Sequence, residues 1–349
     1  MISSIITRLE ETIKRFEFTN FSYTQLKRPL SILIYKDWLK QGLNAEMTYL
    51  EKHLAIKAKP QTQWPSAKSV IVIAQNYIPH PSSHNPLPLN EVQIAKYAQG
   101  HDYHHWFLQK LDDLCKELKS QFPGEDFVAM TDSAPIMERN WAYESGLGWF
   151  GKNSCLINKD YGSFHFLGEI VTSLELQARK DLHHDLCGSC TKCIDACPTM
   201  AIEEGKKIDA NKCISYWTIE TRKTPPKSII NNFTNWLFGC DICQDVCPWN
   251  IKNFKLTKNI NNKPNVNQLV DDLHWLLQES NHQLKKKLKG SPLLRTGPVG
   301  LKKNAIIIAG NFGLTQLKKN ICQYLNHPTL GEVSHWALAE FENPDRITE

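Results

Sequence analysis

The chain has 349 residues, of which 41% are hydrophobic and 22% are charged, and its formal net charge is +5. A chain of this length can bury the cores of two or three domains. Its longest apolar runs, residues 70–74 and 305–309, are far shorter than the roughly 18 residues that a membrane-spanning helix needs. We therefore expect no membrane segment and no membrane partner.

The first expected element is an amphipathic helix over residues 1–16, in which Ile and Leu recur at helical spacing. Because this segment contains Glu10 and Glu11, it is not typical of a signal or transit peptide. With eleven cysteines and no export signal, the chain is expected in the reducing cytoplasm. Two β-branched runs, residues 69–74 and 126–131, predict buried strands and hence an α/β layer.

A histidine-rich patch opens the helix that is expected over residues 95–118, after a proline-rich loop. Its histidines are His101, His104 and His105. They could bind a metal, but no carboxylate or cysteine stands at ligand spacing, so a hydrogen-bonding or solvated role is the better interpretation.

Asp132 follows the second strand and precedes a helix that has Pro135 in its first turn and ends near Gly146. A carboxylate at a strand-to-helix junction can face a ligand. The local pattern by itself favours a simpler role, in which Asp132 or Ser133 caps the helix.

The glycines of residues 146–151 match the dinucleotide-binding pattern G-x-G-x-x-G, and Glu169 stands near the expected acidic position. That fingerprint requires a strand before the glycines and a helix after them. Here a helical pattern precedes them and residues 155–157 predict a strand, so the dinucleotide site is rejected. Alternating large side chains predict a further strand over residues 161–170.

Two cysteine runs dominate the next segment: C-x2-C-x2-C-x3-C-P at residues 187–198 and C-x2-C-x3-C-P at residues 240–248. The first spacing is that of bacterial ferredoxins, in which the fourth cysteine ligates the other cluster. The second run lacks one cysteine, which Cys213 can supply. We therefore predict two [4Fe-4S] clusters, one held by Cys187, Cys190, Cys193 and Cys247 and the other by Cys197, Cys213, Cys240 and Cys243.

Zinc knuckles and disulfides are the competing interpretations of such cysteines. Zinc sites pair two C-x-x-C units, whereas three cysteines at successive spacings of three, followed by C-P, match cubane ligation. Three cysteines remain, Cys115, Cys155 and Cys322. Isolated cysteines of this kind are usually small buried hydrophobic residues.

The segment after residue 250 is rich in lysine and asparagine as far as residue 265, which predicts a linker. Helical patterns over residues 268–278, 301–309 and 332–341 then suggest a repeat-type helical tail. Residues 252–319 contain thirteen basic and three acidic side chains, a local balance of +10 that favours a polyanion such as nucleic acid. A solvated helix face over residues 285–289 is the alternative.

The chain resembles the epoxyqueuosine reductases, the cobalamin-dependent iron–sulfur enzymes of queuosine biosynthesis, over nearly its whole length. The resemblance rests on the motifs at residues 97–104 (YAQGHDYH), 131–135 (TDSAP), 146–153 (GLGWFGKN), 213–220 (CISYWTIE), 239–250 (GCDICQDVCPWN), 294–295 (LR) and 303–305 (KNA). It implies an α+β multidomain fold: a cobalamin-binding α/β domain akin to that of reductive dehalogenases (1–178), a ferredoxin-like domain (179–255) and a HEAT-like helical, tRNA-binding tail (256–349).

The resemblance also implies the reaction, which is reduction of epoxyqueuosine at the wobble position of tRNA to queuosine. Asp132 matches the proposed proton donor, and burial against the corrin and tryptophans is expected to raise its pKa. The cobalamin contacts implied are Lys57, Tyr97, Asp132, Asn153, Ser154, Ser215 and Asp241, and the tRNA contacts are Arg295, Lys302 and Lys303. At positions 57 and 59 the family usually has arginine, so the lysines here lose a bidentate fork.

We further expect a monomer that is recharged by a flavodoxin or a ferredoxin-type electron donor. Two other functions fit part of the sequence. A ferredoxin-type electron-transfer protein would need only the cysteine runs. A reductive-dehalogenase-like cobalamin enzyme would leave the basic tail unexplained.

Overall fold

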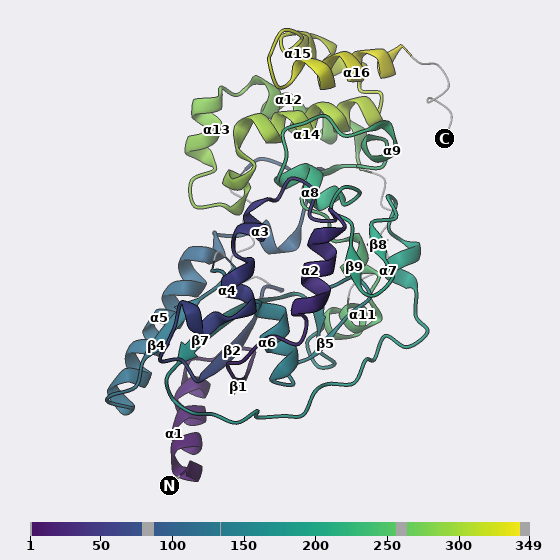
Figure 1. The fold of residues 1–349 in the computed structure, drawn as a ribbon. Coiled ribbons are helices and arrows are strands. Elements are labelled where there is room, and N and C mark those ends of the chain that lie inside the picture. Colours follow the sequence, from purple (N-terminus) through teal and green to yellow (C-terminus); the bar gives the residue numbers. More distant parts are fainter. Residues whose placement is uncertain (1, 79–86, 133, 256–263, 343–349) are drawn as a thin grey trace.

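The computed structural model describes residues 2–78, 87–132, 134–255 and 264–342 (Figure 1). Helix α1 (Ile2–Arg15) confirms the predicted N-terminal helix. A sheet-containing part stands at the α1 end of the molecule, the helical tail stands at the other end, and the cysteine-bearing segment lies beside both. No helix in these ranges is long and apolar enough to cross a membrane.

The central sheet has four strands in the order β1-β2-β7-β4, and every neighbouring pair is antiparallel. Strands β2 (Ser69–Asn76) and β4 (Phe127–Met130) confirm the two predicted β-branched strands. Strand β7 (His165–Thr172) occupies the second half of the third predicted strand, and β1 (Asn20–Gln25) was not predicted. Because the central strands β2 and β7 are buried along nearly their whole length, helices must cover the sheet on either side.

Different helices cover the two faces of this sheet. Helices α1 and α5 (Tyr103–Gln121) pack on the face that presents Ile71, Ile73 and Ile170. Helix α6 (Glu138–Glu144) covers the other face, where Trp141 packs with Val72 and Val171. Residues two apart in a strand share a face, so Glu169 points from β7 toward α6 rather than α5.

Two predicted helix starts are wrong. The chain over the first part of residues 95–118 forms a 3-10 turn, η2 (Lys96–Ala98), and α5 begins only at Tyr103, where Asp102 accepts a hydrogen bond from the His104 N–H. Helix α6 begins at Glu138, with Met137 as its N-cap, so Asp132 lies in the turn before it and does not cap it. Ser133, the alternative cap, lies outside the described residues.

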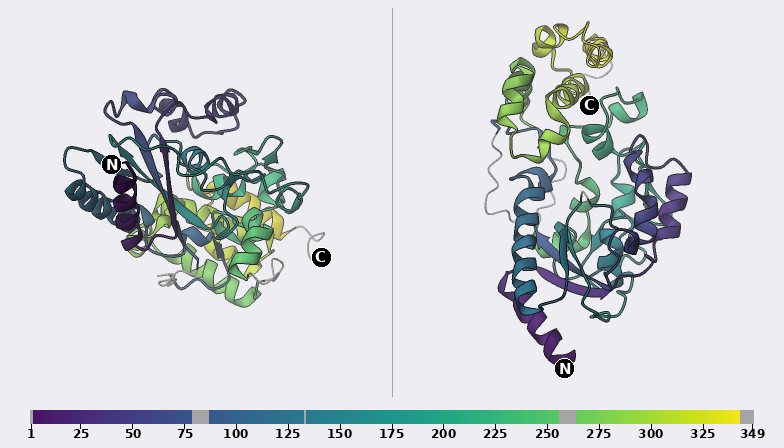
Figure 2. Two further views of the ribbon diagram at one scale, coloured as in Figure 1. Left: turned by 90° about the horizontal axis from the view of Figure 1, so that it is seen from below. Right: turned by 60° about the vertical axis from the view of Figure 1, so that its left-hand side comes forward.

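Four short helical segments precede β2 and lie on the side of the molecule opposite α5 (Figure 2). They are α2 (Ile32–Lys40), α3 (Tyr49–Lys52), α4 (Leu54–Ala58) and η1 (Pro60–Thr62). The glycine-rich segment forms the small hairpin of β5 (Trp149–Phe150) and β6 (Leu156–Ile157), which confirms the predicted strand after the glycines.

The cysteine-bearing segment consists of short elements that place the thiols. Helices α7 (Lys192–Asp195) and α10 (Ile242–Asp245) each hold part of one cysteine run and contact each other. The remaining elements are β8 (Ile202–Glu203), β9 (Lys207–Ile208), α8 (Ile214–Ile219), α9 (Lys227–Ile230), β10 (Trp236–Phe238) and α11 (Pro248–Phe254). Strand β10 pairs in parallel with β3 (Gln93–Ile94), far away in the sequence.

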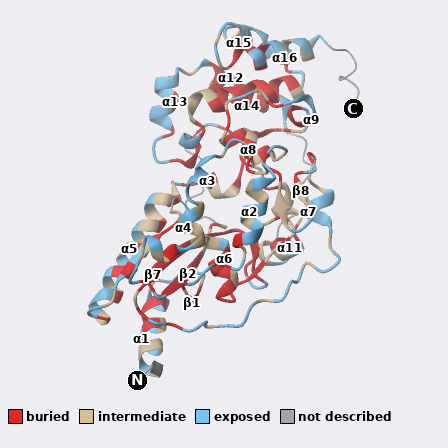
Figure 3. Ribbon diagram, viewed as in Figure 1, coloured by how far each residue is buried: buried red, intermediate tan, exposed pale blue. Residues whose placement is uncertain are grey.

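The tail is built around α14 (Gly297–Asn311), which is buried from Gly300 to Gly310 (Figure 3). The surrounding elements are α12 (Val266–Gln278), α13 (Asn281–Lys287), η3 (Pro292–Arg295), η4 (Thr315–Leu317), α15 (Lys318–Cys322) and α16 (Gly331–Phe341). The three predicted tail helices are thus confirmed. The core of the tail continues into α8, α9 and β10, so tail and cysteine-bearing segment share one hydrophobic core. Most of the predicted linker, residues 256–263, lies outside the described residues.

Candidate functional site

A cavity of about 920 Å³ lies between the sheet-containing part and the cysteine-bearing segment. Its walls come from α2 to α4, α6, β5 and β9, and Arg295 of the tail reaches its rim. Trp38 Nε1 donates a 2.7 Å hydrogen bond to the Ile208 carbonyl and so fastens α2 to the cysteine-bearing segment. This volume is at the upper end for ligand cavities, so the site can take a large cofactor together with a substrate group.

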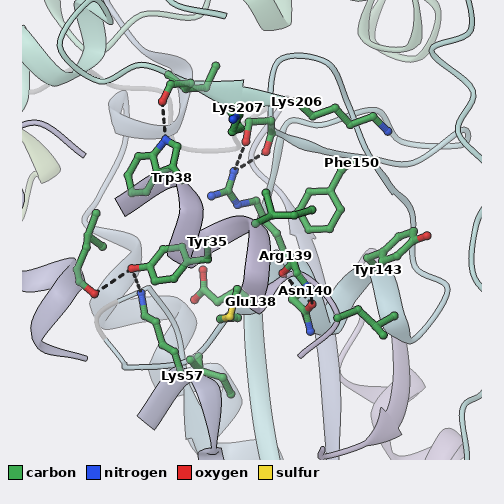
Figure 4. Close-up of a pocket in the computed structure, with 18 of the residues that line it drawn as sticks. Tyr35, Trp38, Lys57, Glu138, Arg139, Asn140, Tyr143, Phe150, Lys206 and Lys207 are labelled. Carbon is green, nitrogen blue, oxygen red and sulfur yellow. Dashed lines mark hydrogen bonds between the residues drawn. The ribbon is translucent and has the colours of Figure 1, made fainter. Parts of the chain in front are cut away.

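Tethered cations line this cavity (Figure 4). The Lys57 ammonium donates to the Tyr35 hydroxyl at 3.1 Å and lies over the Tyr35 ring. The Arg139 guanidinium donates to the carbonyl of Ser154 and, at 3.2 Å, to its hydroxyl. Burial lowers the pKa of Lys57. Both cations are fixed in position before any ligand arrives, which favours an anionic or strongly polar group in the cavity.

Asp132 reaches the cavity from the turn after β4. Its backbone has φ of 43°, in the left-handed region that aspartate tolerates better than most residues, and its N–H donates to Glu138 Oε1. Its carboxyl group is 53% exposed, so it can meet a ligand. Ser154, which also lines the cavity, likewise has a left-handed backbone, with φ of 63°. Two such residues facing one cavity suggest a functional site.

His104 is the direct partner of Asp132. Its Nε2 lies 2.9 Å from Asp132 Oδ2, and its Nδ1 lies 2.7 Å from Asp102 Oδ1. The hydrogen bonds to Asp102 and then to Asp132 raise the pKa of His104 to about 9. His104 is therefore an imidazolium at neutral pH. The histidine-rich patch has the hydrogen-bonding role that the sequence favoured.

The raised pKa expected for Asp132 depends on burial against a corrin, whereas in this structure the pKa of Asp132 is lowered. Burial by itself would raise the pKa of Asp132, but the hydrogen bond and positive charge of His104, with a smaller contribution from Tyr103, lower it. The Asp132 carboxyl is thus ionised at neutral pH, and its hydrogen-bond partner His104 carries a proton.

The eight predicted ligand cysteines fall into the two predicted groups. Cys187, Cys190, Cys193 and Cys247 line one small cavity of about 180 Å³. Burial, then the charges of Cys187 and Cys247, raise the pKa of Cys193. In the other group, burial raises the thiol pKa values of Cys213 and Cys240, and Cys197 adds to both shifts. Burial, and then the charges of Cys155, Cys240 and Cys213, raise the pKa of the Cys243 thiol, so Cys213 lies near this group.

Hydrogen-bond donors surround these sulfurs. Trp149 Nε1 donates to Cys187 Sγ at 3.5 Å, and the Ala201 N–H donates to Cys197 Sγ at 3.3 Å. Backbone N–H groups also point at Cys213, Cys240 and Cys247 and act to lower their thiol pKa values. Such donors stabilise thiolates and tune cluster potentials. None of the eleven cysteines is in a disulfide. The residues present therefore fit two [4Fe-4S] clusters.

The three cysteines outside these groups differ in environment. Cys115 is buried in the core under α5 and Cys322 is exposed on α15. Burial raises the pKa of the Cys155 thiol, and the charges of Cys247 and Cys193 add to this shift. The charge of Cys155 in turn raises the pKa of Cys243, so Cys155 lies near both cluster groups. The prediction of a buried residue is confirmed for Cys115 and wrong for Cys322.

Of the expected cobalamin contacts, Lys57, Asp132 and Ser154 line the large cavity and four others do not. Asn153 lines the small cysteine cavity instead, and Ser215 contacts Cys213 through its backbone. Asp241 is buried, where it accepts a 2.6 Å hydrogen bond from the Lys96 N–H. Tyr97 packs between Tyr103 and Phe238. These four residues therefore lie outside the lining of the large cavity.

The expected tRNA contacts are corrected at two of three positions. Lys302 is 5% and Lys303 0% exposed. Lys303 Nζ donates to the carbonyls of Trp217 and Thr221, and Lys302 Nζ donates to the Glu279 carbonyl and the Tyr324 hydroxyl. Neither ammonium can meet a phosphate, because both already satisfy backbone carbonyls inside the protein. The apolar run of residues 305–309, which directly follows Lys302, Lys303 and Asn304, was the sequence signal that this helix is buried.

Arg295 remains available. It is held by two hydrogen bonds to the Glu220 carboxylate, 2.9 and 3.0 Å long, and it lines the rim of the large cavity. Residues 285–287 and 289, on and after α13, are exposed lysines, in keeping with the solvated helix face. Sequence reasoning missed Glu138 and Arg139, which stand next to Asp132 in this cavity. The only hint in the sequence was that both residues follow closely after Asp132.

Two family models match the chain. One, described as epoxyqueuosine reductase QueG, matches residues 57–133, and the other, described as a 4Fe-4S double cluster binding domain, matches residues 186–250. The first includes Lys57, His104 and Asp132 of the large cavity. The second includes all eight cysteines of the two groups.

Whole-chain comparisons agree with these matches. The chain is 40% identical over 277 residues to the epoxyqueuosine reductase of Synechocystis sp., covering 77% of this chain and 92% of that protein. It is 39% identical over 271 residues to that of Cellulophaga algicola, covering 76% and 85%. A solved structure of epoxyqueuosine reductase with a tRNA-Tyr epoxyqueuosine-modified tRNA stem loop matches with a TM-score of 0.84 at 27% identity, covering 99% of this chain and 92% of that chain.

Proposed function

This chain belongs to the epoxyqueuosine reductase family, and on that premise we propose that it reduces epoxyqueuosine in tRNA to queuosine, with Asp132 as the proton donor. The observation that supports this most directly is one cavity that places the Asp132–His104 pair beside a segment able to hold two [4Fe-4S] clusters. Removal of the epoxide oxygen as water consumes two electrons and two protons. The cluster-holding segment supplies the electrons, and the Asp132–His104 pair supplies a proton.

The clusters pass electrons singly and provide no centre that engages the epoxide. A cobalamin, when bound, would supply a reduced cobalt centre for that step. The large cavity has the volume for it, and Lys57 and Ser154, which line the cavity with fixed polar groups, would hold it. Trp149 links the two sites, because its ring lines the large cavity while its Nε1 donates to Cys187 Sγ.

Proton delivery follows from the geometry around Asp132. The His104 imidazolium gives its proton to the Asp132 carboxylate, and Asp132 gives it to the oxygen of the opening epoxide. Asp102 holds the His104 ring in place through Nδ1, so that Nε2 faces Asp132. General-acid assistance of this kind contributes about 10²- to 10⁴-fold in rate.

The tRNA contacts are proposed for Arg295 at the cavity rim and for the exposed lysines of residues 285–289 in place of Lys302 and Lys303. The related structure holds a modified tRNA stem loop, which supports the same class of substrate here. The modified base would enter the large cavity while surface lysines hold the phosphates. An external flavodoxin or ferredoxin-type donor, a cytoplasmic location, a monomeric state and the three-domain division complete the proposal.

The experiment is anaerobic purification with added cobalamin, iron and cobalt analysis, and nucleoside profiling of epoxyqueuosine-containing tRNA after incubation with a chemical reductant. We expect about eight irons and about one cobalt per chain, and conversion of epoxyqueuosine to queuosine. Eight irons without conversion would favour an electron-transfer protein. Conversion of a small organohalide in place of the tRNA base would favour a dehalogenase-like enzyme.

A further inference from the structure

Glu169 is a buried acid that lies beside the carboxyl group of Glu138. It lies on the central strand β7, it is 0% exposed, and neither carboxyl oxygen has a hydrogen-bond partner within the described residues. Burying an unpaired carboxylate costs several kcal/mol. Such a group remains in a protein core only as a neutral acid, which holds a proton.

Glu138 lies between Glu169 and the large cavity. It is the first residue of α6, on the sheet face toward which Glu169 points, and it lines the cavity near Tyr35 (Figure 4). Its Oε1 accepts the backbone N–H of Asp132. The three acids therefore form a row from the core, through Glu138, to the proton donor at the cavity.

The cations nearby do not neutralise Glu138. Lys57 donates to the Tyr35 hydroxyl and Arg139 donates to Ser154, so both are engaged elsewhere. Burial, and then the charge of Asp132, raise the pKa of Glu138 to about 8, against smaller opposing effects of Arg139 and Lys57. Burial and the Glu138 carboxyl, with Asp132 behind it, raise the pKa of Glu169 well above its ordinary range. Both carboxyls are thus protonated at neutral pH.

We propose that Glu138 and Glu169 form a proton store behind Asp132, and that Glu138 supplies the second of the two protons that the reduction consumes. This rests on the proposed function. The His104–Asp132 pair holds one transferable proton at neutral pH, so a second source is required. The electrons come from the external donor through the clusters.

In the second transfer, the O–H bond of Glu138 breaks, and the proton forms an O–H bond on the departing hydroxide, which leaves as water. The Glu138 carboxylate then takes the proton of Glu169. Because Glu169 is fully buried and Glu138 lines the cavity, a proton from solvent returns to Glu169 through Glu138. Glu138 is a competent acid for this step because hydroxide is a far stronger base than a carboxylate with a pKa of about 8.

Infrared spectroscopy of the substrate-free protein tests the store itself. At pH 7 the parent should show C=O stretching bands of protonated carboxylic acids that disappear in part in Glu138→Gln and in part in Glu169→Gln. Glu144→Gln is the matched control, because Glu144 is a buried acid of the same helix whose Oε1 accepts hydrogen bonds from the Leu30 N–H and Asn140 Nδ2. It should leave those bands unchanged. Their absence from the parent would overturn the proposal.

Turnover rates measured with pre-reduced enzyme and an epoxyqueuosine-containing stem loop test whether Glu138 and Glu169 supply protons to the reaction. Glu138→Gln should slow the first turnover at pH 7 by at least about ten-fold and remove the alkaline limb near pH 8. Glu169→Gln should leave the first turnover near the parent rate and slow those that follow, because Glu138 then regains its proton only from solvent. A merely structural role would slow both alike.

Parent-like rates and pH profiles in Glu138→Gln would overturn the proposal. If Glu169→Gln does not fold, the Glu138→Gln variant is sufficient to test the proposal, because the side chain of Glu138 lines the cavity. The iron content of that variant shows whether it has folded. A parent that shows the infrared bands but leaves epoxyqueuosine unreduced would overturn the proposed function while supporting the proton store.

Discussion

At the scale of single residues, Asp132 combines three unusual properties. Its backbone is left-handed, its carboxyl is half-exposed, and its charge is matched by His104. A left-handed aspartate costs some conformational energy that the fold must offset, here in part through the N–H that Glu138 accepts. The strain points the carboxyl into the cavity, where an N-cap aspartate would instead point at the helix.

Asp132→Asn should retain both clusters and the fold yet lose reduction by about 10²-fold or more, because an amide cannot pass on the proton of His104. Conversion of epoxyqueuosine in the stem loop measures this, with iron content as the check on folding. Asp113→Asn, at an exposed position on α5, is the control and should match the parent. Near-parent turnover in Asp132→Asn would assign the proton to another donor.

His104→Gln should lower the rate by about ten-fold or more and change the pH dependence of stability. The pKa of His104 is raised to about 9 from 6.5 by Asp102 and Asp132. Its charge therefore stabilises the fold fully below about pH 6.5, and this contribution is lost as pH rises through 9. Urea midpoints of parent and variant should differ at pH 6 and converge toward pH 10. His105→Gln, exposed next to it, should show neither effect.

At the scale of elements, α14 joins the tail to the cysteine-bearing segment. Lys303 donates to the carbonyls of Trp217 and Thr221 at and after the end of α8, and the Asn304 amide donates to those of Thr218 and Leu237. These bonds satisfy carbonyls that the end of a helix leaves unpaired. Lys303 and Asn304 therefore connect the buried helix α14 to the cysteine-bearing segment.

Lys303→Met should destabilise the protein by about 2–4 kcal/mol, because methionine fills the space but leaves two buried carbonyls unpaired. Burial lowers the pKa of Lys303 to about 7 from 10.5. The parent should therefore gain stability over the variant as pH rises from about 7 to 10.5. Chemical denaturation at several pH values measures both effects. Lys285→Ala, at an exposed position, should change stability by less than about 0.5 kcal/mol.

At the scale of the whole molecule, the fold brings an antiparallel sheet, two cysteine groups and a helical tail around one cavity. The second cysteine group draws on both cysteine runs and on Cys213 before α8, so it closes only when the whole segment is folded. Tail and cysteine-bearing segment share a core. Loss of one cluster should therefore interrupt electron transfer and also destabilise the rim of the cavity.

Cys213→Ala should reduce the iron content from about eight to about four per chain and abolish reduction of epoxyqueuosine. Electron paramagnetic resonance of the reduced protein should show the signal of the remaining cluster without coupling to a second. Cys322→Ala, at an exposed position on α15, should retain about eight irons and parent activity. Two intact clusters in Cys213→Ala would remove Cys213 from the ligands.

Local patterns in the sequence predicted the elements and chemistry that depend on spacing alone. The cysteine spacings predicted a segment that binds two [4Fe-4S] clusters, β-branched runs predicted β2 and β4, and helical periodicity predicted α1, α12, α14 and α16. Such patterns are informative without a structure, because they depend on local geometry. Ligands a few residues apart, and side chains on one face of a helix, are close together in any tertiary arrangement.

The tertiary structure alone decided which side chains meet across the chain and what surrounds them. It paired Asp132 with His104, whose charge lowers the pKa of Asp132, and it buried Lys303 against α8 instead of exposing it to tRNA. It also placed Glu169 in the core beside Glu138. Burial and the distance to a distant charge set the pKa and availability of a group, and neither can be read from its neighbours in sequence.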